Sequence, residues 1–380
     1  MKLLVDKTKF LKSWSLTERG AGHRSTISVL SGVKCEAGPG GVVLKATDLK
    51  TSISCHAEGV KVEEPGSVIF PVKIIGEFFK KAPGESFTVE VKGGKATMVS
   101  GSSVYKFSTY PVSEFPSLPT SANGQPFFRS LVGDMRRILE EGTFSGSPGE
   151  EFPQYLSAGL IQTEESKVRV VSTDGRRLSL SQGEIKIEGE PDQVLLPLSG
   201  LRELQRALAT VEAEQEIVVS RDDSQVFFVT DGIEFSVRRV ESRFPPYEKV
   251  LSSERTTWIT INRETFIEAL ERTEVIVRDF SRMVVFSLSP GGVLKLQAKA
   301  PEVGEAFEEI EGDCDGEVLK IAFNVKYLLE GLKALHGSSA HLSFNGSNGQ
   351  MTLSRPGEDS FMYVLMPITL PEEGSAEEIQ

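Results

Sequence analysis

Residues 196–209 read LPLSGLRELQRALA, a stretch that predicts an amphipathic helix. Leu201, Leu204 and Leu208 follow one another at i, i+3 and i+7, so their side chains share one helical face. Pro197 lies just ahead of this run, where a missing backbone N–H costs little, and Ser199 is the expected N-cap residue. We expect the leucine face to pack into a hydrophobic core.

The same kind of stretch occurs twice more, as FPVKIIGEFFKKA at 70–82 and FNVKYLLEGLKAL at 323–335. The three copies begin at residues 70, 196 and 323, which places their starts 126 and 127 residues apart. Such even spacing in a chain of 380 residues predicts three copies of one domain. Stacked solenoid arrays are excluded, because their repeats are only about 20–50 residues long.

Each copy is expected to hold two helices with strand-like segments between and after them, which predicts an α+β fold with helices packed on antiparallel sheets. The other helix of each copy is expected at Asp6–Arg19, Arg129–Glu141 and Arg263–Arg272. The domain ranges that the linker-like stretches predict are 1–120, 127–250 and 256–370. Residues 371–380 include four glutamates and are expected to form a disordered acidic tail.

Bulk composition is that of a globular protein with a core in each domain, since 39% of the residues are hydrophobic and 25% are charged. The first seven residues have no long apolar stretch, so we expect no signal peptide. No apolar run approaches the roughly 18 residues that a membrane span needs. Cys35, Cys55 and Cys314 are odd in number and far apart, which argues against a disulfide framework. We therefore expect a cytoplasmic protein without a membrane partner.

The formal net charge of −12 taken alone argues against a nucleic-acid-binding protein, but the charge is unevenly distributed. The six expected helices together carry +5, which leaves −17 for the rest of the chain. Arg202 and Arg206 lie at i, i+4 of one helix, and Lys326 and Lys333 at i, i+7 of another. For any one helix taken singly, a solvated face with ordinary charge pairs would explain the basic residues. A bias shared by three copies favours a basic surface that holds a polyanion without reading its sequence.

No group of residues typical of an active site is found. The four histidines (His23, His56, His336 and His341) are scattered, and none has a carboxylate or second histidine at metal-ligand spacing. The sequence contains no nucleophile elbow, dinucleotide-binding fingerprint or paired-aspartate metal motif. We expect no catalytic residue, no metal site and no cofactor; an enzyme with an unrecognised site is the alternative.

Several motifs together resemble those of one known family. VSTDGRRL at 171–178, FSVRRVESRFPPY at 235–247 and MYVLMP at 362–367 are similar to segments of the bacterial DNA polymerase III β subunits, the sliding clamps. ATDL at 46–49 and FNV at 323–325 agree with the same family, and the resemblance covers residues 1–370 in order. The tripeptide Thr-Asp-Gly alone is a weak signal, because it also occurs at 230–232 as common turn chemistry.

The resemblance implies three similar domains per chain and a ring made by two chains joined head to tail, with helices lining the hole. It implies a non-catalytic processivity factor that encircles double-stranded DNA without sequence preference and slides along it. The implied partners are the replicative DNA polymerase, the clamp loader, and repair proteins that carry a clamp-binding motif. An acidic multi-domain interaction scaffold that never encloses DNA is the alternative.

The resemblance also implies a pocket between the second and third domains that takes short peptides through apolar anchors. The residues carried over to this pocket are Leu156, Thr173, Gly175, Arg176, Arg177, Leu178, Pro245, Lys249, Val250, Val364, Met366, Pro367 and Ile368. Plain core packing is the alternative for Leu178, Val250 and Val364, whereas Met366 near a chain end is harder to explain in that way. Methionine suits a surface that must accept varied peptides.

For DNA binding, the resemblance points to Arg24 and Tyr155. The charge pattern adds weaker candidates at Arg137, Arg202, Arg206, Lys326 and Lys333. For the contact between two chains, Tyr105 and Phe107 on a late strand of the first domain are expected to face Val275 and Ile276 in the third. Packing within one domain is the alternative for this apolar set.

Two features depart from the family pattern. Arg176 stands where the family usually has a histidine, which bears on the local hydrogen bonding. The chain also continues for ten residues beyond Leu370, where many members stop, and this acidic extension is expected to shade the pocket or repel acidic peptides.

Overall fold

The structure is a computed structural model of the 380-residue chain and describes residues 1–22, 25–251, 254–289 and 291–370. The chain forms two units, and each unit draws on separate parts of the sequence. The first unit comprises Met1–Arg136, Ile185–Asp192 and Ser199–Arg239, and the second comprises Arg137–Glu184, Gln193–Leu198 and Val240–Gln380. The middle repeat therefore contributes to both units.

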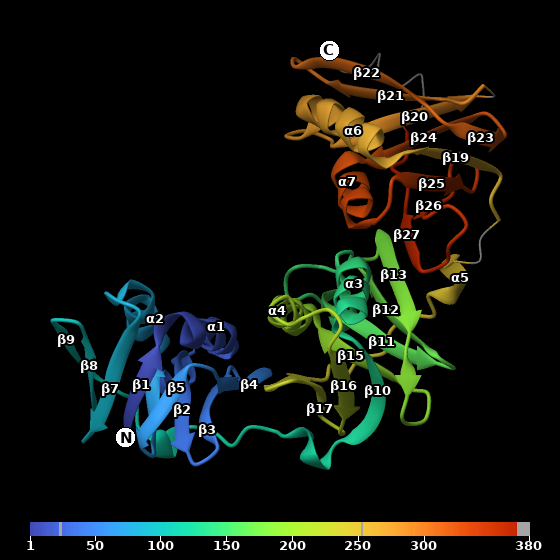
Figure 1. Cartoon of the computed structure of the whole chain (residues 1–380). Coiled ribbons are helices and arrows are strands. Elements are labelled where there is room, and N and C mark those ends of the chain that lie inside the picture. Colours follow the sequence, from blue (N-terminus) through green and yellow to red (C-terminus); the bar gives the residue numbers. More distant parts are fainter. Residues whose placement is uncertain (23–24, 252–253, 290, 371–380) are drawn as a thin grey trace. The chain divides into compact units, whose positions relative to one another are not determined.

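Six helices of ten or more residues occur in the described residues, two in each repeat, as the sequence predicts. They are α1 (Lys7–Thr17), α2 (Val72–Lys81), α3 (Val132–Thr143), α4 (Leu198–Leu208), α6 (Arg263–Val277) and α7 (Val325–Ala334). The short α5 (Glu248–Leu251) precedes the third repeat. In the second unit, α6 packs on β20 (Met283–Ser289), β21 (Val293–Ala300) and β22 (Gly304–Glu311) and lies next to α7 (Figure 1).

The expected start of α4 is wrong in one detail. Strand β15 (Gln193–Pro197) runs up to Pro197 and the helix begins at Leu198, so Ser199 lies inside the helix and not at its N-cap. The leucine face is confirmed as core, because Leu201, Leu204 and Leu208 are each at most 2% exposed. The periodic pattern identified the helix correctly, whereas the preceding strand set its first residue.

The first unit contains two antiparallel sheets. The first sheet has the order β5 (Val60–Glu64), β1 (Lys2–Asp6), β7 (Ser86–Lys92), β8 (Lys95–Ser100), β9 (Ser103–Ser108). The second sheet has the order β14 (Lys186–Ile187), β10 (Gln125–Leu131), β16 (Glu216–Arg221), β17 (Gln225–Thr230), β18 (Ile233–Arg238), β4 (Thr51–Ala57), β3 (Gly41–Thr47), β2 (Gly32–Gly38), β6 (Gly66–Pro71).

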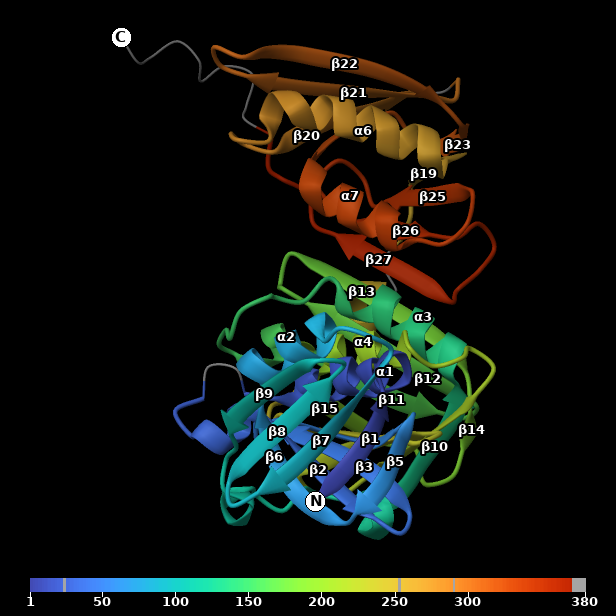
Figure 2. The ribbon, with the colours of Figure 1, turned by 60° about the vertical axis from the view of Figure 1, so that its left-hand side comes forward.

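The second unit also contains two antiparallel sheets, and α6 covers strands β20–β22 of one of them (Figure 2). The third sheet has the order β15, β11 (Ala158–Glu164), β12 (Lys167–Thr173), β13 (Arg177–Glu184), β27 (Phe361–Leu365), β26 (Met351–Ser354), β25 (Ser339–Phe344), β19 (Thr257–Asn262), β23 (Asp313–Gly316). The fourth sheet has the order β22 (Gly304–Glu311), β21 (Val293–Ala300), β20 (Met283–Ser289), β24 (Leu319–Asn324).

The second and third sheets each run without a break from one repeat into the next. In the second sheet β18 of the middle repeat pairs with β4 of the first, with Phe235 opposite Ile53. In the third sheet β27 of the last repeat pairs with β13 of the middle repeat, with Val364 opposite Leu178. Backbone hydrogen bonds thus join the repeats, and the same pair of strand positions is used at both junctions.

A buried carboxylate reinforces the junction in the third sheet. The Glu141 side chain of α3 is fully buried and accepts hydrogen bonds from Arg137 Nη1 at 3.2 Å and Ser181 Oγ at 2.6 Å. The guanidinium of Arg355, from the third repeat, pairs with the same carboxylate and also donates to the backbone oxygen of His336 at 3.0 Å. Middle and third repeats are therefore tied by a desolvated ion pair as well as by strand pairing.

Candidate functional site

The turn Thr173–Arg177 carries the centre of the VSTDGRRL motif and joins β12 to β13. Asp174 Oδ1 accepts hydrogen bonds from the backbone N–H groups of Arg176 and Arg177 at 3.0 and 3.1 Å. Gly175 has φ +84°, a left-handed backbone conformation that favours glycine. The motif residues thereby fix the turn from which β13 begins.

The first repeat contains the same turn at Thr47–Thr51. Asp48 Oδ1 accepts from the N–H groups of Lys50 and Thr51 at 2.9 and 2.6 Å, and Leu49 takes the left-handed position with φ +73°. The Thr-Asp pair therefore belongs to the repeated fold. The second copy has glycine instead of leucine at the left-handed position, and arginine instead of threonine at its last position.

The Arg177 side chain is only 7% exposed and connects the middle repeat to the third. Its Nε donates to Asp174 Oδ2 at 3.0 Å, its Nη1 pairs with Glu330 of α7, and its guanidinium lies 4.2 Å from the ring centre of Tyr327. Burial opposes the charged form, yet Tyr363 and the two carboxylates raise the pKa of Arg177 above its ordinary value. The side chain is a fixed cationic wall of the site.

Next to this wall lies an apolar cluster that we call the docking face. Its buried members are Ala158, Leu160, Val171, Leu178, Leu180, Leu195, Phe244, Tyr247 and Val364, with Tyr155, Val240, Val250, Leu251 and Met362 partly buried at its edge. Leu178 and Val364 are 5% and 1% exposed, so the alternative of core packing describes their side chains correctly. Leu178 and Val364 form the buried floor of the docking face, and more exposed residues surround this floor.

The exposed rim of the docking face includes the end of β27. Met366 is 46% exposed, and its N–H donates to the backbone oxygen of Arg176 at 2.9 Å. Pro367 and Ile368 are partly exposed, and the Ile368 N–H donates to the Ala322 oxygen at 2.8 Å. These backbone bonds hold an exposed methionine beside a buried apolar floor.

All thirteen residues carried over by the resemblance lie in the second unit. Leu156 and Pro245 are partly exposed, whereas Arg176 and Lys249 are exposed, and Thr173 uses its hydroxyl within the turn. The sequence reasoning missed Tyr327 and Glu330, which hold Arg177, although both lie in the quoted stretch 323–335. A signal was available there, since Glu330 follows Lys326 at i+4 on the polar face of that helix.

Five of the candidates for DNA contact lie on described α-helices, and most of these have acidic neighbours. Arg206 pairs with Glu203, Lys326 lies 3.7 Å from Glu330, and Lys333 lies 2.7 Å from Glu271. In addition, Arg202 is partly exposed on α4, Arg137 belongs to the Glu141 cluster, Tyr155 packs edge-on against Phe244, and Arg24 lies outside the described residues. The basic bias of the helices is therefore moderated locally by paired carboxylates.

The candidates for a contact between chains divide into buried and exposed members. Phe107 of β9 packs against the core of the first repeat, and Ile276 of α6 against that of the third, so packing within a domain describes these two. Tyr105 is 38% exposed, with its ring centre 4.0 Å from that of Phe78, and Val275 is 67% exposed. Tyr105 and Val275 therefore remain candidates for a contact with a second chain.

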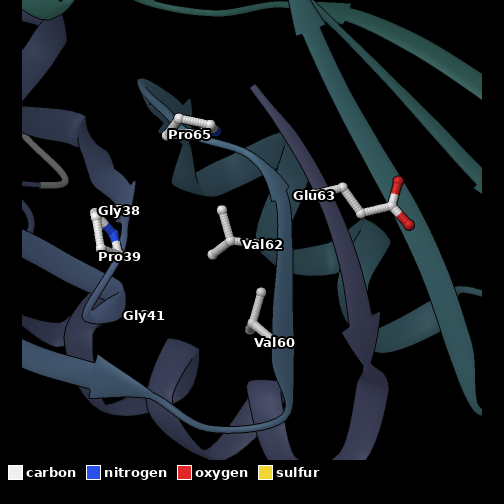
Figure 3. Close-up of a pocket in the computed structure, with 7 residues that line it drawn as sticks. All are labelled: Gly38, Pro39, Gly41, Val60, Val62, Glu63 and Pro65. Atoms are coloured by element: carbon white, nitrogen blue, oxygen red, sulfur yellow. The ribbon is translucent and has the colours of Figure 1, made fainter.

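A separate hollow of about 390 Å³ lies in the first unit, where the Gly38–Gly41 hairpin faces β5 (Figure 3). Val60 and Val62 point into it, whereas the Glu63 carboxylate points away and pairs with Lys2 at 2.9 Å. No set of polar groups converges there, so it lacks the lining of a catalytic pocket.

The described residues form neither a candidate metal site nor a candidate membrane-spanning helix. Within the described ranges, no three His, Cys, Asp or Glu side chains are grouped so that they could hold a metal ion. No described helix has the length and apolar character needed to cross a membrane.

The fold and the docking face define a class of protein. Its members have three clamp-type α+β repeats and an apolar face where the second and third repeats share a sheet. Family models of the N-terminal, central and C-terminal domains of the DNA polymerase III beta subunit match residues 1–119, 133–246 and 248–369. The chain belongs to this family, the bacterial beta sliding clamps.

Full-length relatives agree with this assignment. The beta sliding clamp of Pseudomonas putida is 30% identical over 97% of this chain and 100% of its own length, and that of Bacillus subtilis is 26% identical over 97% and 99%. Among solved structures, the Thermotoga maritima DNA polymerase III beta subunit superposes with a TM-score of 0.90 at 27% identity, covering 97% of this chain and 100% of its own. The Pseudomonas aeruginosa sliding clamp bound to griselimycin gives 0.91 at 27%, with the same coverage.

Proposed function

We propose that two copies of this chain form a closed ring around double-stranded DNA, slide along it and tether the replicative DNA polymerase. The chain works as a non-catalytic processivity factor in the cytoplasm, and its three domains span 1–120, 127–250 and 256–370. A clamp loader opens and loads the ring, and repair proteins with a clamp-binding motif share the docking face. The sliding-clamp relatives and the repeated strand junction support this proposal.

The strand junctions supply the single observation that carries the ring. At both junctions, the last strand of one repeat (β18 or β27) pairs with the fourth strand of the preceding repeat (β4 or β13). By the same rule β9, the last strand of the first repeat, requires β22 of a third repeat, and among the described strands both are sheet edges. We infer that a second copy, joined head to tail, supplies the partner strand for each of these edges, so that two chains close the circle.

The side chains on these two edges suit each other. β22 carries four glutamates (Glu305, Glu308, Glu309 and Glu311), the first three of which already form ion pairs within the chain, and an exposed Phe307. β9 carries Lys106 beside the exposed Val104 and Tyr105. Opposite charges on the two edges would fix the register and disfavour pairing of two like edges. An apolar centre with a charged rim is the usual composition of a stable interface.

The ring predicts topological retention on DNA. When the chain is loaded onto a nicked circular plasmid by a clamp loader and ATP, it should stay with the plasmid during gel filtration in 0.5 M salt. At this concentration the Debye length is only about 4 Å, so attraction between exposed charges is largely screened. Cutting the plasmid once should release at least about 90% of it, because phosphate contacts alone are weak at high salt. Equal release from circular and linear DNA would instead favour a scaffold that never encloses DNA.

The docking face predicts that Met366 is needed for binding a peptide with apolar anchors. Met366→Ser should weaken binding of a fluorescein-labelled peptide carrying Leu-Phe by about tenfold, since loss of one buried anchor contact costs about 1–2 kcal/mol. Fluorescence anisotropy measures this effect. Val318→Ser, at a 71% exposed valine of the same repeat, is the control and should leave affinity unchanged. Unchanged affinity in Met366→Ser would argue against the docking face.

A further inference from the structure

A cavity of about 290 Å³ lies in the second unit, beyond the residues assigned to peptide binding. Its apolar floor is made by Leu180 of β13, Met362 of β27, and Tyr247 and Leu251 next to and within α5. Leu180 and Tyr247 are 2% and 4% exposed, whereas Leu251 and Met362 are partly exposed. This floor can accept an aliphatic chain.

The cavity continues the docking face. All four floor residues belong to the same apolar cluster as Leu178, so no polar gap separates the cavity from the peptide site. The short helix α5 lies alongside β13 (Figure 1), and its first and last residues, Glu248 and Leu251, line the cavity, whereas Lys249 and Val250 between them are assigned to the peptide site. A bound peptide that passes α5 would reach the cavity directly.

Among the described residues that line the cavity, the one cation, Arg169, is already neutralised. Arg169 of β12 pairs with Glu164 at 2.5 Å, and its Nε donates to the side-chain oxygen of Gln182 at 3.0 Å. Gln182 is itself 7% exposed and donates to the backbone oxygen of Asp359 at 3.2 Å. These groups satisfy one another and form a polar wall without surplus positive charge.

The remaining charges that line the cavity are negative. Glu248 and Asp359 are both exposed, and neither has an ion-pair partner among the residues that the structure describes. Glu248 also acts on the adjacent Tyr247, whose pKa is raised first by burial and then by this carboxylate. The cavity thus combines an apolar floor with an acidic rim, which matches a side chain with an aliphatic stem and a cationic end.

We propose that peptides bound to the docking face extend past α5 and place a lysine or arginine side chain in this cavity. The inference rests on the proposed function and adds a preference for a basic residue at a fixed distance from the apolar anchors. Leu178 and Leu180 are two residues apart on β13, and Gln182 is two residues further, so the cavity lies roughly 7–14 Å from the peptide floor. About three residues of extended peptide span that distance.

Anisotropy titrations with labelled peptides test this preference. Each peptide carries Leu-Phe and three spacer residues followed by lysine, norleucine or glutamate, with the extension built on either end of the anchor pair in turn. In the best orientation, the lysine peptide should bind about five- to tenfold tighter than the glutamate peptide at low salt, with norleucine between them. The difference should shrink as sodium chloride is raised, because the rim carboxylates are exposed.

A double variant separates the cavity from the docking face. Glu248→Gln with Asp359→Asn should reduce the lysine-over-glutamate preference to less than twofold, while a peptide that ends at Leu-Phe binds as before. Glu317→Gln with Asp313→Asn removes the same two charges elsewhere in the third repeat and should keep the preference.

The outcomes distinguish the two proposals. Equal affinities of the lysine and glutamate peptides, or a preference that survives Glu248→Gln with Asp359→Asn, would overturn the cavity assignment alone. Failure of the short Leu-Phe peptide to bind would remove the proposed function of the docking face, and the cavity assignment with it.

Discussion

Val275→Glu is expected to convert the chain from a dimer into a monomer. Val275 lies in the last turns of α6 and is 67% exposed, so the substitution leaves the core of the third repeat intact. In the proposed ring it packs against β9 of the partner, beside Tyr105. Burying an unpaired carboxylate there costs about 3–5 kcal/mol at each interface, which is roughly a hundredfold or more in dissociation constant.

Sedimentation velocity at micromolar concentration measures the change of state, and circular dichroism checks that the fold is kept. Tyr105→Glu, on the opposite side of the same contact, should have the same effect, because a head-to-tail interface uses two different surfaces. Val318→Glu is the matched control, as it places the same charge at a 71% exposed valine away from the contact, and should remain dimeric. A Val275→Glu variant that sediments as a dimer would contradict the interface.

Glu141→Gln is expected to destabilise the second unit by on the order of 3–5 kcal/mol. The substitution removes the charge but keeps the size of a fully buried side chain. Arg355 is only 11% exposed and would then keep only Glu358 as a counter-ion, a 59% exposed carboxylate 4.0 Å away. Loss of one partner costs more than the pair itself contributes, because the desolvation of the other is no longer compensated.

Urea unfolding followed by intrinsic fluorescence measures this loss. Glu140→Gln, the neighbouring exposed glutamate on the same helix, should change stability by less than about 0.5 kcal/mol. A shift in Glu141→Gln no larger than in this control would show that the buried pair contributes little. A large shift would show that the buried ion pair contributes to the stability of the second unit.

Local patterns in the sequence were enough to predict most of the architecture. Helical spacing of Leu201, Leu204 and Leu208 identified a buried face, and the even recurrence of that stretch identified three repeats. The start of α4 was missed because Ser199 is a good N-cap by type, while the end of β15 at Pro197 is set by pairing with β11. Residue type alone does not report that pairing.

The candidate site was predicted less completely. Motif resemblance placed Leu178, Val364 and Met366 in one site. Leu178 and Val364 pair across β13 and β27 and belong to one apolar cluster, and Met366 follows the end of β27. The partners of Arg177 were missed, since Glu330 is 153 residues away along the chain. The acidic cavity beyond α5 was missed for the same reason, because its lining comes from β12, β13, β27 and α5.

By itself, the sequence determined the family, the threefold repeat, and which helix faces are apolar, because periodicity and motifs are local properties of the chain. Only the tertiary structure decided which strands continue a sheet into the next repeat, how Glu141 and Arg177 are neutralised, and where an acidic rim borders the docking face. Those features depend on contacts between distant segments. Burial then sets their energy, since a charge removed from water needs a partner that the fold must supply.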